Sequence, residues 1–288
     1  GKVMDDLDAR LAVEDIELAL MKTLALFYTA KGITHAALGE PTQALASYET
    51  ALKCDKNYPR VHAALGSYYY SLNRLDDAQA AFQKALDLDP ETPSAHYGMG
   101  VVDYELGDFE AARDWLQEAI RLAEAEGAKP TRLAAYYTVK GRAHGALGEP
   151  DQALVYYETV LRYDENYWRA HLALGNHYYS LREFDKAEKA FKRALDLEAN
   201  LPIAQYGLGT VYFERGDYQA ALALFEEAVQ FAETAGEEPA LIYLIKGRTH
   251  SKLNQPAEAL EAFQAVLESK SGALEIRGEA EREIERLQ

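Results

Sequence analysis

The feature that most constrains the fold of this chain is a 34-residue spacing of glycines. The spacing runs through two groups of three glycines, and a further glycine begins another unit: Gly32, Gly66, Gly100, Gly141, Gly175, Gly209 and Gly247. An alanine follows each glycine after twelve residues and a bulky residue after sixteen, as Ala78 and Phe82 follow Gly66. This period, with small residues that let two helix axes approach closely, is typical of a helix–turn–helix solenoid.

The chain also repeats itself over a longer distance. KGITHAALGEPTQALASYETAL at 31–52 returns 109 residues later as KGRAHGALGEPDQALVYYETVL at 140–161, and a third copy begins at 246–263. In the shared LGEP, we expect Leu38 to end one helix, Gly39 to adopt the left-handed conformation and Pro41 to begin the next helix. We therefore interpret the repeat as an internal duplication of a helical unit.

These features resemble the tetratricopeptide repeat (TPR) family. Residues 59–92 match the family pattern most fully, through Leu65, Gly66, Tyr69, Ala78, Phe82, Ala85 and Pro90. The resemblance covers about seven repeats, at 25–58, 59–92, 93–126, 134–167, 168–201, 202–235 and 240–273. It implies an all-α, right-handed superhelical solenoid of helix–turn–helix repeats, in which the first helix of each repeat lines a concave surface.

The segments outside this register complete the expected domain organisation. Inserts at 127–133 (GAKPTRL) and 236–239 (GEEP) separate repeats one to three (25–126), four to six (134–235) and seven (240–273). We interpret the inserts as lengthening helices without changing their stacking, and a change of superhelical pitch is the alternative. We expect residues 1–24 to form an N-terminal helical cap that packs on repeat one, and residues 274–288 to form a C-terminal capping helix.

Composition limits the classes of function. The formal net charge of −17 disfavours nucleic acid, and it fits a basic or apolar protein or peptide partner better than an acidic one. No stretch is apolar enough for a membrane span, and Cys54 is the only cysteine. A cytoplasmic location is favoured, but Gly1 is an unusual first residue, so a missing native N-terminus leaves a periplasmic or secreted location as an alternative.

The sequence carries no pattern typical of catalysis. We find no HExxH, CxxC, P-loop or GxGxxG motif. The glycines follow the 34-residue repeat and do not cluster in a phosphate-binding loop. No two histidines are four residues apart, the spacing of a local metal pair on a helix. We therefore expect no enzyme activity, no catalytic residues, no metal and no cofactor.

Repeats one, four and seven share one further pattern. Each carries a lysine four residues before a histidine, where the family usually has leucine and tyrosine: Lys31 with His35, Lys140 with His144, and Lys246 with His250. The interpretation that we favour lays the lysine along a neighbouring helix and gives the histidine a local hydrogen bond. A binding role is the alternative, because the pattern recurs in all three copies.

The TPR resemblance implies that partner contacts come from the second, fifth, ninth, twelfth and thirteenth positions of each repeat. From these positions we predict the partner-binding residues Arg60, Ser67, Tyr70, Tyr97, Val101, Tyr104, Thr138, Arg142, Arg169, Asn176, Tyr179, Tyr206, Thr210, Phe213 and Arg248. The aromatic members recur in both halves of the chain, and tyrosine is enriched at interface hot spots. The alternative is that these rings pack on the adjacent first helix and only line the wall.

The sequence therefore predicts a protein–protein interaction scaffold that binds a peptide segment of a partner in an aromatic concave groove. The groove positions lack the Lys, Asn and Arg set with which some TPR proteins clamp a C-terminal carboxylate, so an acidic chaperone tail is disfavoured. Two alternatives remain, namely an assembly protein that self-associates as a homo-oligomer, and a receptor for a small ligand or glycan that uses the same groove. The sequence does not define the partner, its motif or the oligomeric state.

Overall fold

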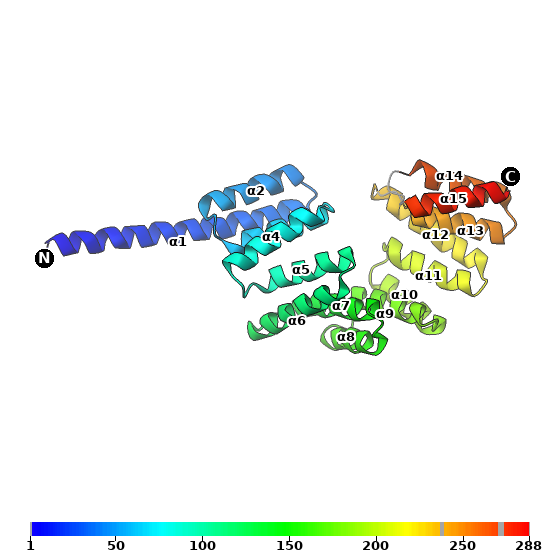
Figure 1. Cartoon of the computed structure of the whole chain (residues 1–288), viewed down its shortest axis with the longest axis horizontal. Helices are drawn as coiled ribbons and strands as arrows, with labels where there is room; N and C mark the ends of the chain where they lie inside the picture. The colour runs from blue at the N-terminus through cyan, green and yellow to red at the C-terminus, as the bar shows by residue number, and fades with distance from the viewer. Residues whose placement is uncertain (1, 237–238, 270–273, 288) are drawn as a thin grey trace. The chain divides into compact units, whose positions relative to one another are not determined.

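The computed structural model describes residues 2–236, 239–269 and 274–287, with side chains from residue 15 onward. Within these ranges the chain forms helices and no strand, which confirms the all-α prediction (Figure 1). The helices are α1 (Lys2–Ala37), α2 (Pro41–Cys54), α3 (Pro59–Ser71), α4 (Leu75–Leu88), α5 (Pro93–Leu106), α6 (Phe109–Ala125), α7 (Pro130–Ala146), α8 (Pro150–Tyr163), α9 (Trp168–Ser180), α10 (Phe184–Leu197), α11 (Pro202–Glu214), α12 (Tyr218–Thr234), α13 (Ala240–Lys252), α14 (Pro256–Glu268) and α15 (Leu274–Leu287).

Within each of the two compact units, residues 1–149 and 150–288, successive helices pack as the expected pairs. α1 pairs with α2, α3 with α4, α5 with α6, α9 with α10, α11 with α12, and α13 with α14. The turn predicted for the LGEP phrase is observed between α1 and α2, where Gly39 has a φ of +70° and Pro41 is the first residue of α2. The amide of Glu40 donates to the carbonyl of His35, and that of Gly39 to the carbonyl of Ala36, so two carbonyl groups at the end of α1 are satisfied.

The periodic glycines make room for aromatic rings between repeats. A Cβ atom on Gly66 of α3 would stand 2.6 Å from the ring of Phe82, and one on Gly98 of α5 would stand 2.2 Å from the same ring. Phe82 is 2% exposed, so backbone on both sides holds its ring in place. The same arrangement recurs around Phe191 in α10. The periodic glycines Gly66 and Gly175 therefore encode one side of this contact, and Gly98 and Gly207, which lie outside the 34-residue series, supply the other.

The helices form two compact units, residues 1–149 and 150–288. The first unit contains α1 to α7, and the second contains α8 to α15. The division falls inside the fourth expected repeat, where the sequence shows no break. α7 belongs to the first unit because its Leu133 and Tyr136 pack in one core cluster with Ala119 and Ile120 of α6.

The first insert lengthens the helices around it. α6 and α7 have 17 residues each, against 14 in α4 and α5. Gly127 has a φ of +68° in the turn, and Pro130 is the first residue of α7. α12 also has 17 residues, and residues 237–238 of the second insert lie outside the described residues. The lengthening is observed, and unchanged stacking remains a prediction.

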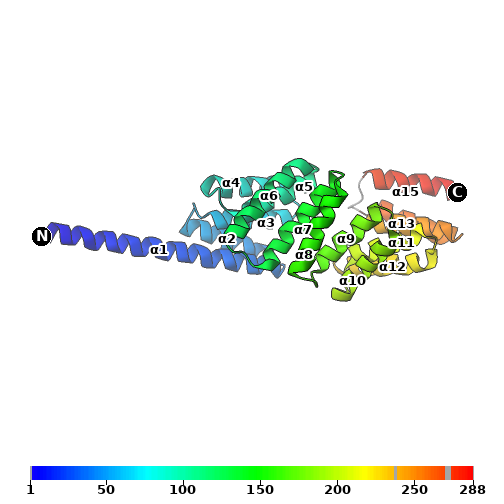
Figure 2. The same cartoon turned by 90° about the horizontal axis from the view of Figure 1, so that it is seen from below.

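α1 runs through the expected N-terminal cap without a break. Its N-terminal half extends beyond the other helices of the first unit in both views (Figure 1, Figure 2). The side chains of residues 15–23 are exposed, so the expected packing on repeat one is not observed for them. In the second unit, α15 packs on α13 and α14 through Ile276, Ala280 and Ile284, in the place where a capping helix was expected.

Candidate functional site

A groove of about 510 Å³ opens on the first unit. Leu26 and Ile33 of α1 and Arg60, Ala63 and Ser67 of α3 form part of its wall. These residues occupy the second and ninth positions of repeat one and the second, fifth and ninth positions of repeat two. The groove is thus built at the positions where the TPR resemblance places partner contacts, and it contains the predicted residues Arg60 and Ser67.

The first turn of α5 and the segment between α6 and α7 complete the wall. Pro93 and Ser94 come from α5, Glu126 directly follows α6, and Arg132 lies in the first turn of α7. Nη1 of Arg132 lies 3.2 Å from Oε2 of Glu126, which pairs the two charges. The first insert therefore contributes a side chain to the groove.

The remaining charges of the groove are unpaired within the described part of the chain. Arg60 is exposed, and no carboxylate there lies within ion-pair distance of it. Asp89 and Glu91, in the turn between α4 and α5, also line the groove and have no lysine or arginine at that distance among the described residues. Asp89 Oδ1 accepts the amide of Glu91 at 3.1 Å, which orders the turn. The groove therefore offers one guanidinium and two carboxylates to a ligand.

Two predicted residues of the first unit, Tyr70 and Arg142, meet at Glu105 of α5. The hydroxyl of Tyr70 on α3 donates to Glu105 Oε1 at 3.4 Å, and Nη2 of Arg142 on α7 lies 3.8 Å from the same oxygen. The guanidinium of Arg142 also lies over the ring of Tyr104, 4.4 Å from its centre. Burial, and then Glu105, raises the pKa of Tyr70, so its hydroxyl stays protonated and can donate at neutral pH.

The other predicted residues of the first unit pack on their neighbours. The ring of Tyr97 stacks on that of Tyr136 with centres 4.4 Å apart, and Val101 packs against a core cluster that α6 and α7 form. Thr138 is 6% exposed, and its hydroxyl donates to the carbonyl of Ala134 at 2.7 Å. Thr138 is therefore not accessible to a partner in this structure.

In the second unit the predicted arginines and aromatic residues contact neighbours on their own unit. The guanidinium of Arg169 lies over the ring of Trp168 at 4.2 Å, and Nη2 of Arg248 donates to Oε2 of Glu279 on α15 at 2.7 Å. The ring pairs are Tyr179 with Phe184, Tyr206 with Phe225, and Phe213 with Tyr218, with centres 5.3–6.0 Å apart. All three predicted rings are half-buried, so each packs on one side and remains accessible on the other.

The predicted polar residues and the tyrosine hydroxyls of the second unit differ in accessibility. Asn176 is exposed, whereas the hydroxyl of Thr210 donates to the carbonyl of Tyr206 in its own helix at 2.7 Å. Burial raises the pKa of both Tyr179 and Tyr206, so these hydroxyls are protonated at neutral pH.

Sequence reasoning missed part of the groove. Leu26, Thr29 and Ile33 occupy the second, fifth and ninth positions of repeat one, and applying the same rule to that repeat identifies them. Asp89 and Glu91 lie in a turn between helices, and no rule for helix positions could have indicated them.

The histidines of the three Lys–His pairs each bind locally. Nδ1 of His35 contacts Glu40, and Nδ1 of His144 contacts Glu149. Nδ1 of His250 lies 2.9 Å from Oε1 of Gln255. Each partner stands five residues after its histidine, next to the first residue of the following helix. The predicted local hydrogen bond is confirmed, and it joins the end of one helix to the start of the next.

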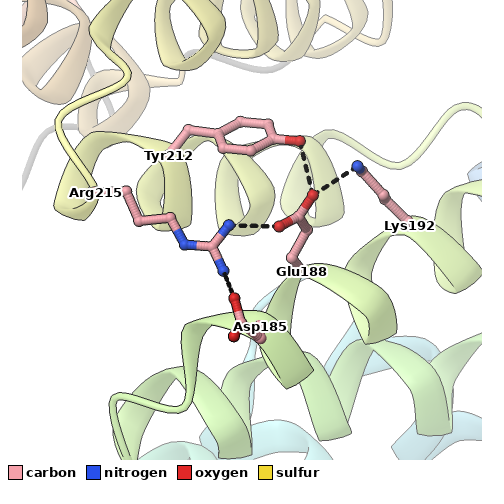
Figure 3. Close-up of polar contacts among 5 residues, drawn as sticks. All are labelled: Asp185, Glu188, Lys192, Tyr212 and Arg215. Atoms are coloured by element: carbon pink, nitrogen blue, oxygen red, sulfur yellow. Dashed lines mark hydrogen bonds and ion pairs between the residues drawn. The ribbon is translucent and has the colours of Figure 1, made fainter.

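A second polar cluster lies between α10 and α11 and contains no predicted site residue (Figure 3). Glu188 accepts hydrogen bonds from Lys192 Nζ at 2.6 Å, from the hydroxyl of Tyr212 at 3.0 Å and from Arg215, and Arg215 also pairs with Asp185. These donors, Lys192 foremost, lower the pKa of Glu188 to about 2. The cluster joins the second helix of repeat five to the first helix of repeat six.

Among the residues that the structure describes, no three His, Cys, Asp or Glu side chains are placed to hold a metal ion. None of the described helices combines the length and the apolar character that crossing a bilayer requires.

The chain belongs to the tetratricopeptide repeat family. The family matches residues 63–127, 138–202 and 172–237, and a second description of the same repeat matches residues 240–272. Family and groove together place the chain among protein–protein interaction scaffolds.

Curated relatives match parts of the chain. It is 29% identical over 132 residues, 45% of its length, to the anaphase-promoting complex subunit CDC16 of Saccharomyces cerevisiae. It is also 29% identical over 118 residues, 41% of its length, to the small glutamine-rich tetratricopeptide repeat-containing protein 2 of the same yeast. The chain spans only 16% and 32% of the length of these two relatives.

Solved structures agree on the fold. The APC/C hetero-tetramer Cut9–Hcn1 matches with a TM-score of 0.70 and 18% identity over 95% of this chain and 55% of that one. The thermophilic TPR protein TTC0263 of Thermus thermophilus matches with a TM-score of 0.57 and 28% identity over 68% of this chain and 98% of that one.

Proposed function

We propose that this chain binds a peptide segment of a partner protein in the groove of the first unit, without catalysing a reaction on it. The observation that carries the proposal is the composition of the wall, which comes from the partner-contact positions of adjacent first helices. Leu26, Ile33 and Ala63 give it an apolar surface, and Arg60 and Asp89 add charges. Ligand sites are typically concave and mostly apolar, with a few polar groups that fix orientation.

The row formed by Tyr70, Glu105 and Arg142 extends this surface along three first helices. Glu105 lies 3.4 Å from the Tyr70 hydroxyl and 3.8 Å from Arg142, so it restrains both side chains before a partner binds. The guanidinium of Arg142 has more N–H groups than its contact with Glu105 uses, and they can donate to carbonyl groups of a bound segment. We assign Tyr104 to the same surface, because its ring supports Arg142.

In the second unit, the half-buried rings of Tyr179, Tyr206 and Phe213 support a second binding surface for the same partner or another. A ring that already packs on one side adds contact area on the other at small entropic cost. Arg248 is engaged by Glu279, so it serves a partner only if that ion pair opens.

The relatives support a role in protein assemblies. CDC16 is, by its printed name, a subunit of the anaphase-promoting complex. This chain spans 16% of that protein, so we carry over only the general role in assembly and no partner.

A retention experiment followed by calorimetry tests the proposal. Proteins from the source cell that bind the wild-type chain, but not a variant with Tyr70, Tyr104, Tyr179 and Phe213 changed to alanine, are identified by mass spectrometry. Calorimetry with that partner should then show a loss of about 1–3 kcal/mol for Tyr70→Ala, as is usual for a hot-spot tyrosine. Tyr163→Ala on the second helix α8 is the matched control, and binding of Tyr70→Ala at wild-type strength would contradict the assignment.

Self-association is a second candidate function, and α1 is the observation that favours it. Ile16, Leu20 and Phe27 lie four and seven residues apart, so they share one stripe of the helix, and they are 54–67% exposed. A second copy of the chain could cover this stripe. Sedimentation equilibrium should then show a concentration-dependent dimer that Leu20→Glu abolishes, whereas a wild-type monomer at every concentration excludes this candidate.

A further inference from the structure

The two copies of the duplication differ at the positions that create space in the first-unit groove. Ala63 and Ser94 line the groove, and their counterparts 109 residues later are Leu172 and Ile203. Leu172 packs beside Trp168 over a core cluster of the second unit, so a larger side chain at this position is compatible with the fold. The first-unit groove is therefore lined by two small side chains at positions where the second copy has larger apolar ones.

The charges at the groove define a second property of the ligand. Asp89 and Glu91 line the groove with no lysine or arginine within ion-pair distance among the described residues, Arg121 attracts Glu91 only from farther away, and Arg132 pairs with Glu126. Arg60 is the other charge of the described wall without an ion pair, and the whole wall has three carboxylates (Asp89, Glu91, Glu126) and two guanidinium groups (Arg60, Arg132). The chain as a whole carries a formal charge of −17, and its field adds to the attraction of cations.

We propose that the first-unit groove selects a basic, apolar peptide segment, which places a large apolar side chain against Ala63 and a lysine or arginine beside Asp89 and Glu91. This inference rests on the proposed function and names the ligand chemistry of the same site. Burial of the apolar side chain supplies affinity, and charge complementarity supplies orientation and a fast association rate.

Selection of peptides from a displayed random library for binding to the full chain tests this inference. The selected peptides should be enriched in Lys and Arg together with Leu, Ile, Phe or Met. Their affinity, measured by fluorescence anisotropy, should fall about tenfold on the double change Asp89→Asn with Glu91→Gln, since close charge pairs at an interface are worth about that much. Glu198→Gln, the counterpart of Asp89 in the second unit, is the matched control and should leave affinity unchanged.

Two variants that fill the groove separate this inference from the proposed function. Ala63→Leu and Ser94→Ile introduce the residues of the second copy, and each should lower peptide affinity about tenfold by occupying the space of the apolar side chain. Ser94 is exposed, so Ser94→Ile keeps the test valid if Ala63→Leu fails to fold.

The outcomes are distinct. If the selected peptides are acidic or uncharged and do not bind the filled variants, the charge inference is overturned, and the assignment of the groove as the binding site stands. Peptides that bind both filled variants at wild-type strength overturn the groove itself, and a library that yields no binding peptide does the same.

Discussion

Replacing Glu188 with glutamine should destabilise the second unit by about 1–2 kcal/mol near neutral pH. The change keeps the size of the side chain, and glutamine is already the residue at position 79, the counterpart of Glu188 in the first copy. It removes the carboxylate that Lys192, Tyr212 and Arg215 share (Figure 3). The perturbation therefore tests whether this cluster stabilises the contact between α10 and α11.

The magnitude follows from the pKa of Glu188, which falls from its ordinary value of 4.5 to about 2. Each pKa unit corresponds to about 1.4 kcal/mol, which sets an upper limit of about 3 kcal/mol. The side chain of Lys192 is 53% exposed, so solvent screens the largest contribution, and a glutamine oxygen can still accept hydrogen bonds. About 1–2 kcal/mol remains, which corresponds to a fall of about 3–6 °C in the melting temperature of a unit of this size.

The assay is thermal unfolding of both proteins by circular dichroism over a range of pH. Because the pKa is lower in the folded state, the carboxylate stabilises the fold fully above pH 4.5, and this stability is lost as the pH falls toward about 2. The difference in melting temperature should therefore be largest near pH 7 and should shrink as the pH falls below 4.5. Added salt should also reduce it, since two of the partners are solvent-accessible.

Gln79→Glu in the first unit is the matched control. The counterparts of Lys192 and Arg215 are Gln83 and Leu106 there, and the neighbour of Gln79 is the buried Asp103. A carboxylate at position 79 should therefore destabilise the first unit by repulsion. Equal melting temperatures for wild type and Glu188→Gln near pH 7, or a difference that grows on acidification, would refute the reasoning.

Two further substitutions test packing and backbone strain in the second unit. Gly175→Ala should lower the free energy of unfolding by about 1–3 kcal/mol in urea, because the new Cβ would stand 2.5 Å from the ring of Phe191, and adding Phe191→Leu should recover part of the loss. A single variant as stable as wild type would disprove this close contact. Arg182→Gly should raise stability by about 0.5–1 kcal/mol, since Arg182 has a φ of +58° that glycine adopts without strain. A lower melting temperature in calorimetry would show instead that the exposed pair of Arg182 with Glu214 outweighs the strain.

Most of the helical architecture could be predicted, because the residues that define the period are also the residues that make the contacts. Gly66 predicts a close approach, and in the structure it faces the ring of Phe82. Gly39 and Pro41 predict a turn with a left-handed residue followed by a helix start, and both are observed. The division after residue 149 could not be predicted, since the period runs through it unchanged.

The candidate site was less predictable, because a helix position fixes direction but not surroundings. Thr138 and Ser67 share the expected stripe, yet Thr138 is buried and Ser67 lines the groove. Whether a ring such as Tyr97 faces solvent depends on the neighbouring helix, and here Tyr136 stacks on it. Arg142 was predicted from its position in the repeat, whereas its place over Tyr104 depends on the spacing of two helices. Tertiary distances of this kind leave no pattern in a single sequence.

The duplication shows which constraints the fold imposes and which it leaves free. Phe82 and Phe191 are counterparts, and both keep their glycine neighbours, because any larger residue there would meet a ring that cannot move. The polar contacts between repeats are under no such constraint: where Glu188 binds Lys192 and Arg215, the first copy has Gln79 beside Asp103. Polar contacts of this kind give hydrogen-bond partners to the side chains that form them, but they do not set the distance between helices. The residues that form them can therefore differ between the two copies without changing the fold. The groove residues Ala63 and Ser94, which are Leu172 and Ile203 in the other copy, show the same freedom on a surface that we propose faces a ligand.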